Sequence, residues 1–325
     1  MRAVVYEKFG EPGDVLTIEE RPIPEPGPGE VRLALILSPV HHHDLEIVRG
    51  LYGYKPPLPA TPGTEAVARV DALGPGVSHL AVGDRVTVYK DQNIWAEYFL
   101  APARVAVPLP DTVSDEVACQ LYVMPATAYV LLESVALRPG QWLAINAANG
   151  ALGRLVNFLA RRRGLRVLSL VRGTAAVTAL NELGFDPALD TESEGWLDQI
   201  EAVTQGAPIT RAIDQLGGKA TGDELTLLAK EGRLISLGDL AGESMQLDTD
   251  TLIFKRAVIE GYWARSRIDL VPDMQFMRVF GDLIKLAAQG VVPIDIEAAY
   301  PLESAAEAAI ATETRGRNAK VGLRA

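Results

Sequence analysis

Residues 142–153 read WLAINAANGALG, and this stretch decides the fold. Its opening, residues 142–146, is an apolar run typical of a buried strand. A glycine-containing turn follows, then a helical pattern at 154–163 and a second apolar run at 166–171. A strand, a helix and another strand in this order predict a βαβ unit of a parallel sheet.

The turn has an A-x-x-G-x-x-G pattern and leads directly into the helix. Glycines there let the backbone approach a pyrophosphate, which sits on the free N–H groups and positive dipole end of the helix. The alternative is an ordinary glycine-containing turn, but the flanking strand and helix favour a dinucleotide site. The predicted cofactor-binding residues of the turn are Ala147, Asn149, Gly150, Leu152 and Gly153.

The end of the second strand indicates which dinucleotide binds. An NAD-binding protein usually has an acidic residue there, about 20 residues past the last glycine, for the ribose 2′-hydroxyl. Residues 169–173 read SLVRG and contain no carboxylate, whereas Arg172 suits a 2′-phosphate. We therefore predict NADP(H), the alternative being that Arg172 is a solvated loop charge. Lys219 either reaches the cofactor or only solvent, and both interpretations stay open.

Further apolar runs extend the α/β pattern. Buried strands are expected at 211–214, 233–237 and 257–261. With the first two strands they predict a Rossmann-like sheet of about six strands. This nucleotide-binding domain is assigned to residues 119–266.

The remaining chain has a different texture. Residues 1–118 are rich in proline and glycine, and turns separate short β-like runs at 31–37, 66–73 and 85–90, which is typical of a compact, mainly β domain. Residues 267–325 contain an expected helix at 276–289 and an expected strand at 319–323. This segment is too short to fold alone, so we expect it to rejoin the N-terminal domain.

Composition excludes several classes of function. The chain has 325 residues, 48% of them hydrophobic, so it can bury a substantial core. A net charge of −11 disfavours a nucleic-acid partner, and the single Cys119 rules out an internal disulfide and a thiolate-rich zinc site. Residues 1–6 lack the apolar region of a signal peptide, and the longest low-charge stretch, 117–132, is shorter than the roughly 18 to 20 residues that span a bilayer. We expect a cytoplasmic protein with no membrane segment.

Several motifs together resemble one known superfamily. They are MRAVVY at 1–6, FGEP at 9–12, PGTE at 62–65, VGDRV at 82–86 and MPATAY at 124–129. With the glycine turn, they resemble the medium-chain dehydrogenase/reductase superfamily over essentially the whole chain. The resemblance implies an α/β protein with a GroES-like, mainly β catalytic domain and a Rossmann doubly wound nucleotide domain. It also implies a homodimer.

The resemblance is closest to zinc-independent branches. Segments 49–53, 217–219, 252–255 and 261–263 are similar to NADPH-dependent 2-enoyl thioester reductases of the mitochondrial type. Zinc members carry a cysteine three residues before an aspartate, where this chain has His41 before Asp44, and a Gly-His-Glu segment, where it has Thr64. The four-cysteine lobe is also absent. The resemblance therefore implies an oxidoreductase without a metal site.

The run HHHD at 41–44 admits three interpretations: metal binding, packing or polar pocket lining, and contact with substrate or nicotinamide. Side chains alternate on an extended segment, so at most His41 and His43 are expected to converge. We assign His41 to the lining of the substrate pocket.

The expected reaction is hydride transfer from NADPH to an activated C=C bond, most concretely a 2-enoyl thioester. Tyr52 matches the tyrosine of the enoyl reductases and is the predicted catalytic donor, or else a pocket wall, with Tyr54 as the fallback. Trp263 lines the substrate cleft at the domain junction or packs in the core. The alternatives are an NADPH:quinone reductase and a non-catalytic NADPH-binding sensor or structural protein.

Overall fold

A computed structural model of the chain describes residues 1–89, 93–271, 273–314 and 319–325. It divides into two compact units. The β unit comprises Met1–Pro125 and Met277–Ala325, and the α/β unit comprises Ala126–Phe276. The domain boundaries expected after residues 118 and 266 stay predictions, because the two units describe contacts within one chain and not independent folding.

The β unit is built on a seven-stranded sheet with the order β14-β15-β3-β4-β5-β7, in which β6 also pairs with β3. The long β3 alternates half-buried and buried residues, as expected of an antiparallel strand with one face on the core. A separate pair, β1 and β2, is antiparallel. The strands are β1 (Arg2–Val5), β2 (Thr17–Glu20), β3 (Glu30–Pro39), β4 (Glu65–Leu73), β5 (Arg85–Tyr89), β6 (Tyr98–Pro102), β7 (Ala106–Pro108), β14 (Ile296–Pro301) and β15 (Lys320–Arg324).

The runs expected at 31–37 and 66–73 are confirmed as β3 and β4, and β5 covers 85–89, residue 90 lying outside the described residues. The helices of this unit are α1 (Pro12–Val15), α2 (His42–Arg49), α3 (Asp115–Ala118) and α12 (Ala305–Glu313), with 3₁₀ turns at Ala103–Val105 and Leu302–Ser304.

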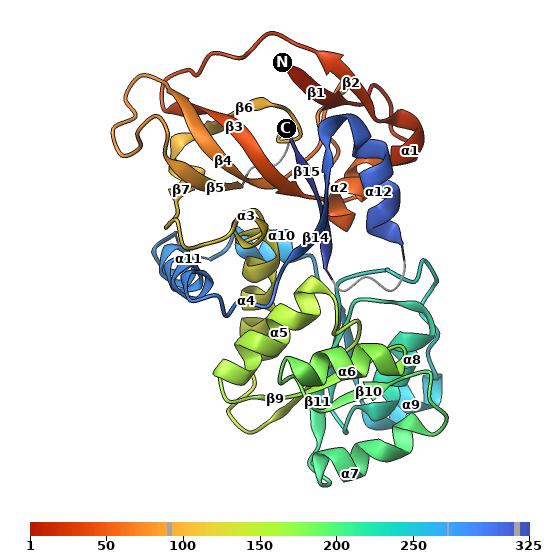
Figure 1. The fold of residues 1–325 in the computed structure, drawn as a ribbon. Coiled ribbons are helices and arrows are strands. Elements are labelled where there is room, and N and C mark those ends of the chain that lie inside the picture. The colour runs from red at the N-terminus through yellow and green to blue at the C-terminus, as the bar shows by residue number, and fades with distance from the viewer. Residues whose placement is uncertain (90–92, 272, 315–318) are drawn as a thin grey trace. The chain divides into compact units, whose positions relative to one another are not determined.

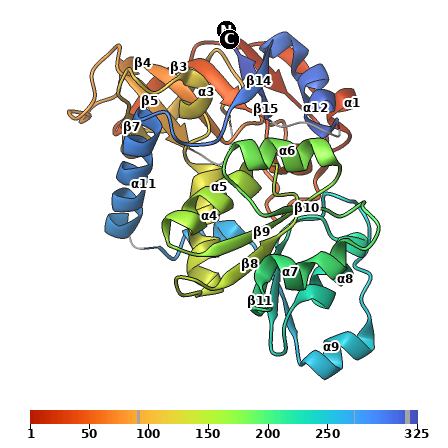
Figure 2. The ribbon, with the colours of Figure 1, turned by 60° about the horizontal axis from the view of Figure 1, so that its bottom comes forward.

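The end of the chain lies beside its beginning in the β unit. The blue strands β14 and β15 run next to the orange β3, and α12 lies against α1 (Figures 1 and 2). β15 pairs antiparallel with β3 through Gly322 and Pro39, and the Val40 N–H donates to the Val321 carbonyl at 2.9 Å. This pairing carries Lys320, the first residue of β15, to the start of α2.

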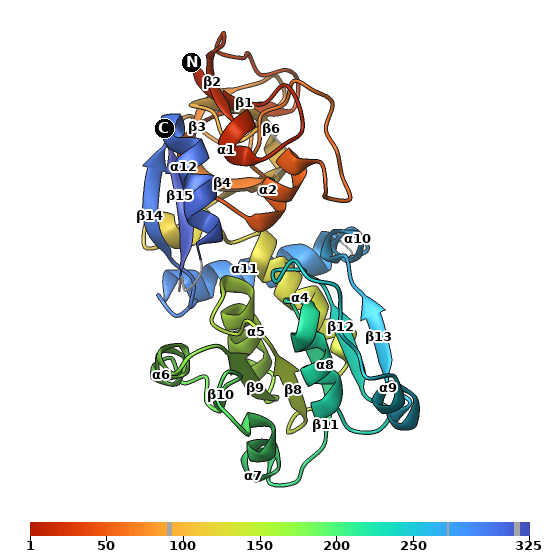
Figure 3. The same ribbon diagram turned by 90° about the vertical axis from the view of Figure 1, so that its right-hand side faces the viewer.

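The α/β unit contains a six-stranded sheet in the order β10-β9-β8-β11-β12-β13, with every pair parallel. Figure 3 shows β10 and β13 at opposite edges of this sheet. Numbered along the sheet, the order is 3-2-1-4-5-6, the arrangement of doubly wound dinucleotide-binding folds. The strands are β8 (Trp142–Ile145), β9 (Arg166–Val171), β10 (Ala188–Asp190), β11 (Ile209–Asp214), β12 (Arg233–Ser236) and β13 (Val258–Gly261).

The expected parallel sheet of about six strands is thereby confirmed. Its helices are α5 (Ala151–Arg162), α6 (Thr174–Glu182), α7 (Ile200–Thr204), α8 (Gly218–Leu227), α9 (Thr249–Lys255) and α10 (Ala264–Ile268), with a 3₁₀ turn at Trp196–Gln199. Two helices span the boundaries of the units, α4 (Val123–Val135) and α11 (Asp273–Ala288). No helix in the described part of the chain has the length and apolar character to cross a membrane.

Each unit has its own core. The sheet of the β unit buries residues such as Val31, Leu33 and Trp95 completely. In the α/β unit, Ala144 of β8, Leu168 of β9 and other strand residues are fully buried. The strand order reverses between β8 and β11, and in open α/β sheets ligands bind outside the carboxyl ends of the strands at such a point.

Candidate functional site

The predicted phosphate-binding turn lies at the carboxyl end of β8. Gly150 caps the N-terminus of α5, and the Gly150 N–H donates to the Ala147 carbonyl at 3.0 Å. Ala147 itself has a positive φ of 45°, which places its backbone in a tight turn. The first N–H groups of α5 therefore point outward from the switch point of the sheet, where an anion is stabilised by the helix dipole.

Gly153 is required by the closeness of the turn to the helix. A Cβ atom on Gly153 would lie 2.5 Å from the Ala148 Cα atom, a distance that real structures do not allow. The third glycine of dinucleotide-binding turns has this role of close packing. The Leu152 side chain is only 7% exposed, so Leu152 can contribute to a cofactor site only through its backbone.

A buried polar network holds the loop on the other side of the switch point. Asp214, the last residue of β11, accepts hydrogen bonds from Asn146 Nδ2 at 2.7 Å and Thr221 Oγ1 at 2.6 Å. It also accepts the backbone N–H groups of Leu216 at 2.9 Å and Gly217 at 3.0 Å. Asp214 therefore anchors the loop that follows β11.

The two basic residues assigned to the cofactor are both accessible. Arg172 is exposed directly after β9. The nearby Asp190 carboxylate accepts the backbone N–H groups of Gly173 at 2.8 Å and Glu192 at 3.0 Å, and these bonds lower its pKa. Lys219 is paired with Asp223 at 2.6 Å and is 72% exposed, so the structure leaves both of its interpretations open.

A second site lies in the β unit, where α2 begins. Residues 41–44 do not form the expected extended segment: His41 is the extended N-cap residue, and α2 starts at His42. Asp44 in the first turn accepts the His41 backbone N–H at 3.0 Å, which stabilises the start of the helix. The rings of His41 and His43 nevertheless stack, with centroids 4.8 Å apart and an interplanar angle of 17°.

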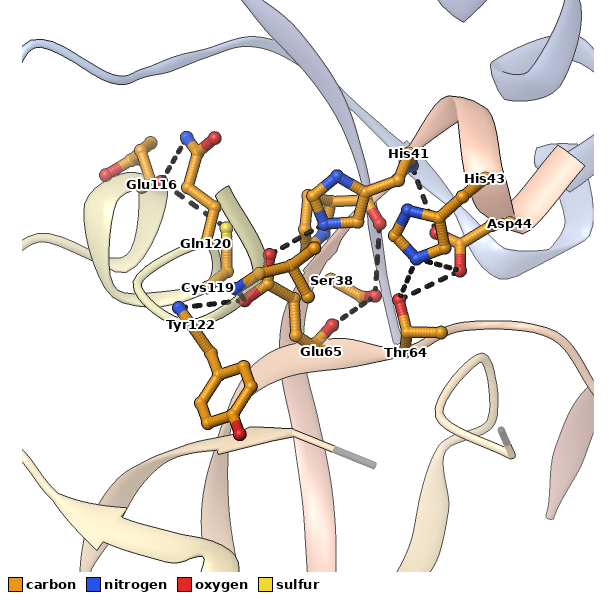
Figure 4. A network of polar contacts seen from close by, with 12 residues as sticks. Ser38, His41, His43, Asp44, Thr64, Glu65, Glu116, Cys119, Gln120 and Tyr122 are labelled. Carbon is orange, nitrogen blue, oxygen red and sulfur yellow. Dashed lines mark hydrogen bonds and ion pairs between the residues drawn. The ribbon is translucent and has the colours of Figure 1, made fainter. Parts of the chain in front are cut away.

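His41 forms a buried pair with Glu65, the first residue of β4 (Figure 4). His41 Nε2 and Glu65 Oε1 are 2.6 Å apart, and both side chains are completely buried. Burial penalises charge on both partners, so it holds the pKa of His41 well below its usual range and raises the pKa of Glu65 to about 7. Both members of the pair are thus driven toward their neutral forms.

The other carboxylate oxygen of Glu65 caps α4. Glu65 Oε2 accepts the backbone N–H groups of Tyr122 and Val123, each at 3.0 Å. These are donors at the N-terminus of a helix, which otherwise lack partners within the helix. Glu65 is therefore both a partner of an imidazole and a structural cap.

The approach to Glu65 is shaped by Gly63. This glycine has a φ of +95°, and a Cβ atom there would lie 2.3 Å from the Trp95 ring. Only glycine lets the chain turn over Trp95 and place Thr64 and Glu65 next to α2.

Thr64 connects two residues of α2. Thr64 Oγ1 donates to Asp44 Oδ1 at 3.0 Å and lies 2.9 Å from His43 Nε2. Figure 4 shows the three side chains converging. The ring of Tyr52, in the loop after α2, lies 5.8 Å from the His43 ring, so the predicted donor is next to this group.

Comparisons with known proteins agree with this architecture. Residues 27–111 match the family model described as the alcohol dehydrogenase GroES-like domain, and residues 151–278 match the model described as zinc-binding dehydrogenase. A mitochondrial enoyl-[acyl-carrier-protein] reductase of Xenopus tropicalis is 30% identical over 297 residues, 87% of this chain and 85% of that protein. The chain belongs to the medium-chain dehydrogenase/reductase superfamily. The resemblance and the fold class inferred from the motifs are thereby confirmed.

Two solved structures of this superfamily cover the whole chain. A Bacillus thuringiensis protein assigned as an NADPH:quinone reductase is 27% identical, with a TM-score of 0.89 and 98% of that chain covered. A mycobacterial protein solved in complex with NADPH is 26% identical, with a TM-score of 0.86 and 100% of that chain covered.

Zinc members of the superfamily have a cysteine and a histidine ligand where this chain has His41 and Thr64. His41 Nε2 is bound to Glu65, and the Thr64 hydroxyl is bound to Asp44. Zinc takes thiolate, imidazole or carboxylate ligands, so a threonine in place of a histidine removes a ligand. Within the described residues, no cluster of three His, Cys, Asp or Glu side chains is placed to hold a metal ion.

The remaining predicted residues belong to different units, Tyr54 to the β unit and Trp263 to the α/β unit. Tyr54 is half-buried in the loop after α2. Trp263 is 44% exposed at the start of α10, so its packing in a core is contradicted, and its role in substrate binding stays a prediction. For His43 the sequence left three interpretations open, and its contact with Thr64 could not be predicted because the two residues are 21 positions apart in the chain.

Proposed function

We propose that this chain is an NADP(H)-dependent oxidoreductase that reduces the C=C bond of a 2-enoyl thioester without zinc. The observation that carries the proposal is the hydrogen-bonded group of His43, Thr64 and Asp44 beside Tyr52. Thr64 in this group stands where zinc relatives have a histidine ligand. Hydrogen-bond donors at this site suit a substrate whose C=C bond is already conjugated with a thioester carbonyl. The similarity to enoyl-[acyl-carrier-protein] reductases supports the same substrate class.

The residues of the α/β unit fit NADP(H). Gly153, next to the turn before α5, cannot be replaced by a residue with a Cβ atom, because that atom would collide with Ala148. The N-terminus of α5 suits the pyrophosphate. Arg172, exposed at the end of β9, suits the 2′-phosphate. NADPH, when bound, supplies the hydride for the β-carbon of the substrate.

The chain's own residues orient the acceptor and stabilise charge. When the β-carbon is reduced, negative charge grows on the thioester oxygen, and a hydrogen bond from the Tyr52 phenol stabilises it. His41, Tyr54 and Trp263 are proposed to line the substrate pocket. Because His41 is fully buried and its ring stacks on that of His43, it can line the pocket only from behind His43.

Quinone reduction is the second candidate, because the Bacillus thuringiensis protein is assigned to it and has the same fold over the whole chain. A quinone needs a flat apolar surface and no precisely placed acid. Steady-state NADPH oxidation with crotonyl-coenzyme A and with a naphthoquinone separates the candidates. We expect faster turnover of the thioester. Turnover of only the quinone would refute the proposal, and tight NADPH binding with turnover of neither would favour a sensor or structural protein.

We propose that zinc has no part in this activity. The basis is the loss of the superfamily's ligands at His41 and Thr64, together with the single cysteine in the sequence. Elemental analysis should give far less than one zinc per chain, and activity should survive a chelator. One zinc per chain, with activity lost on its removal, would contradict this.

We also propose that the chain forms a homodimer through the edge strand β13. This strand ends the sheet of the α/β unit, and its Val258 is 54% exposed. Ile253 and Phe254 of α9, which precede β13 by a few residues in the chain, are 58% and 71% exposed and add apolar surface. Light scattering should give twice the chain mass, and Val258→Lys should reduce it. A monomer in the unmutated protein would end this proposal.

A further inference from the structure

A chain of hydrogen bonds in the β unit connects a buried carboxylate to a partly exposed imidazole (Figure 4). Asp44 accepts from the Thr64 hydroxyl, and the same hydroxyl oxygen lies 2.9 Å from His43 Nε2. The Asp44 side chain is 0% exposed, whereas that of His43 is 19% exposed. His43 is therefore the end of the chain that a small molecule can reach.

The order of donors fixes which nitrogen of His43 changes its protonation. A hydroxyl has one proton, and Thr64 gives it to Asp44 Oδ1. The Thr64 oxygen can then only accept, so His43 Nε2 carries a hydrogen and donates it. The Nδ1 atom is left as the position where a proton is gained or lost. In acid–base catalysis, a second group commonly orients the base, and a carboxylate in turn holds that second group. Thr64 and Asp44 have these positions relative to His43.

The charged neighbours of His43 come from several elements. Asp44 on α2 favours a positive ring, and so does Glu65 on β4 when it is ionised. A charged His42 on α2 would oppose it, and desolvation lowers the pKa of His42 to about 4. Lys320 on β15 acts on the neighbouring His41 and His42. His41, stacked against the ring, is kept neutral because burial lowers its pKa. Tyr52 faces the ring and carries no charge at neutral pH. The buried Asp44, whose Oδ1 atom lies 3.6 Å from His43 Nε2, is thus the anion that supports an imidazolium here.

We propose that His43 is the proton donor of the reaction and that Tyr52 serves as the hydrogen-bond donor to the thioester oxygen. This inference rests on the proposed function. The electron pair released toward the α-carbon when the β-carbon accepts hydride forms the new C–H bond with the Nδ1 proton of His43. His43 is left neutral, with its Nε2–H still on Thr64, and it regains a proton from water.

The first test is the pH dependence of kcat with NADPH and crotonyl-coenzyme A. In the unmutated protein, kcat should fall as the pH rises through the ionisation of His43, because the donor loses its proton. His43→Gln should lower kcat by about a hundredfold, the smaller end of an acid–base contribution, and abolish this fall. His42→Gln is the matched control, since it removes an exposed histidine from the same helical turn, and it should change neither quantity.

The second test does not use activity. NMR titration of the histidine ring protons in the free protein should give His43 the same midpoint as the kcat profile. Thr64→Val should lower that midpoint, because His43 Nε2 loses its hydrogen-bond acceptor while Asp44 Oδ1 stays 3.6 Å away. Melting temperatures check folding, and His43→Asn replaces His43→Gln if the latter does not fold.

The outcomes separate the two proposals. If the unmutated protein reduces the thioester and His43→Gln keeps its rate and pH profile, the role of His43 is refuted while the proposed function stands. If the unmutated protein shows no thioester turnover, both are refuted. A His43 midpoint that differs from the kinetic one also overturns the inference.

Discussion

Asp214 and Asp44 are both buried carboxylates at the end of a secondary-structure element, yet their surroundings differ. Asp214 accepts four hydrogen bonds, two of them from backbone N–H groups of the following loop. Asp44 accepts the His41 N–H and the Thr64 hydroxyl, and the second of these leads on to an imidazole. The donors therefore differ: those of Asp214 hold a loop, whereas one donor of Asp44 also contacts an imidazole.

The same difference applies to the two sites. In the α/β unit, polar groups at the carboxyl ends of β8 and β11 are bound to one another and shape a loop. In the β unit, burial moves the pKa values of His41 and Glu65 away from their usual ranges. We expect variants in the first region to change stability and cofactor affinity, and variants in the second to change turnover and pH dependence.

The largest effect is expected at Asp214. Asp214→Ala leaves three buried donors and one partly buried donor without their acceptor, and each buried donor costs about 1 to 3 kcal/mol. The free energy of unfolding, measured by urea denaturation, should fall by at least about 3 kcal/mol. Asp223→Ala is the control: it removes only the surface pair with Lys219, so it should cost less than about 1 kcal/mol. Similar losses for the two variants would break the comparison.

Glu65 shares features of both carboxylates, since it caps α4 and also binds an imidazole. Its pKa is raised to about 7 in the folded chain, so the native state holds this proton more tightly than the unfolded state. The stability that this proton contributes is complete below the unfolded pKa, near 4.5, and is lost as the pH rises to about 7. Over that window the unmutated protein should lose about 3 kcal/mol relative to Glu65→Gln.

Urea denaturation of both proteins at several pH values measures this difference. Equal pH dependence in the two proteins would show that Glu65 is a cap alone, like Asp214.

Tyr52→Phe tests the chemistry of the β unit. Loss of the phenol that stabilises the growing negative charge should lower kcat for crotonyl-coenzyme A by about a hundredfold. Quinone turnover should fall less than about tenfold, because the aromatic wall remains and only a hydroxyl is lost. NADPH affinity should hardly change. An unaltered rate with the thioester would make Tyr52 a wall residue and leave the β unit without its proposed hydrogen-bond donor.

Arg172→Ala tests binding in the α/β unit and has the smallest expected effect. A charge-assisted contact with the 2′-phosphate is worth about 1.5 to 3 kcal/mol, so NADPH affinity should fall by roughly ten- to a hundredfold. NADH affinity and kcat at saturating NADPH should stay the same. Titration by nicotinamide fluorescence measures both affinities, and equal affinities for the two cofactors in the unmutated protein would refute the assignment.

Local sequence determined most of the α/β unit. The apolar run of β8, the turn with Gly150 and Gly153, and the helix α5 follow one another in the chain, so their pattern was sufficient to predict them. Parallel strands buried on both faces have a strong apolar signal, and a glycine next to a backbone atom has no substitute. The partners of Asp214 within its own loop are local in sequence, whereas Asn146 lies 68 residues away and is brought close by the pairing of β8 with β11.

Only the tertiary structure decided the polar site of the β unit. The sequence suggested an extended HHHD segment, but the first turn of α2 forms because Asp44 returns to the His41 N–H. The partners of this segment are far away in the chain: Thr64 and Glu65 arrive on β4, and Lys320 arrives on β15 through pairing with β3. Whether a histidine binds metal, lines a pocket or donates a proton depends on these partners and on burial, and no local pattern contains them. The sequence by itself therefore determined the fold and a dinucleotide-binding turn, whereas the packing of distant strands determined which side chains meet at the candidate site.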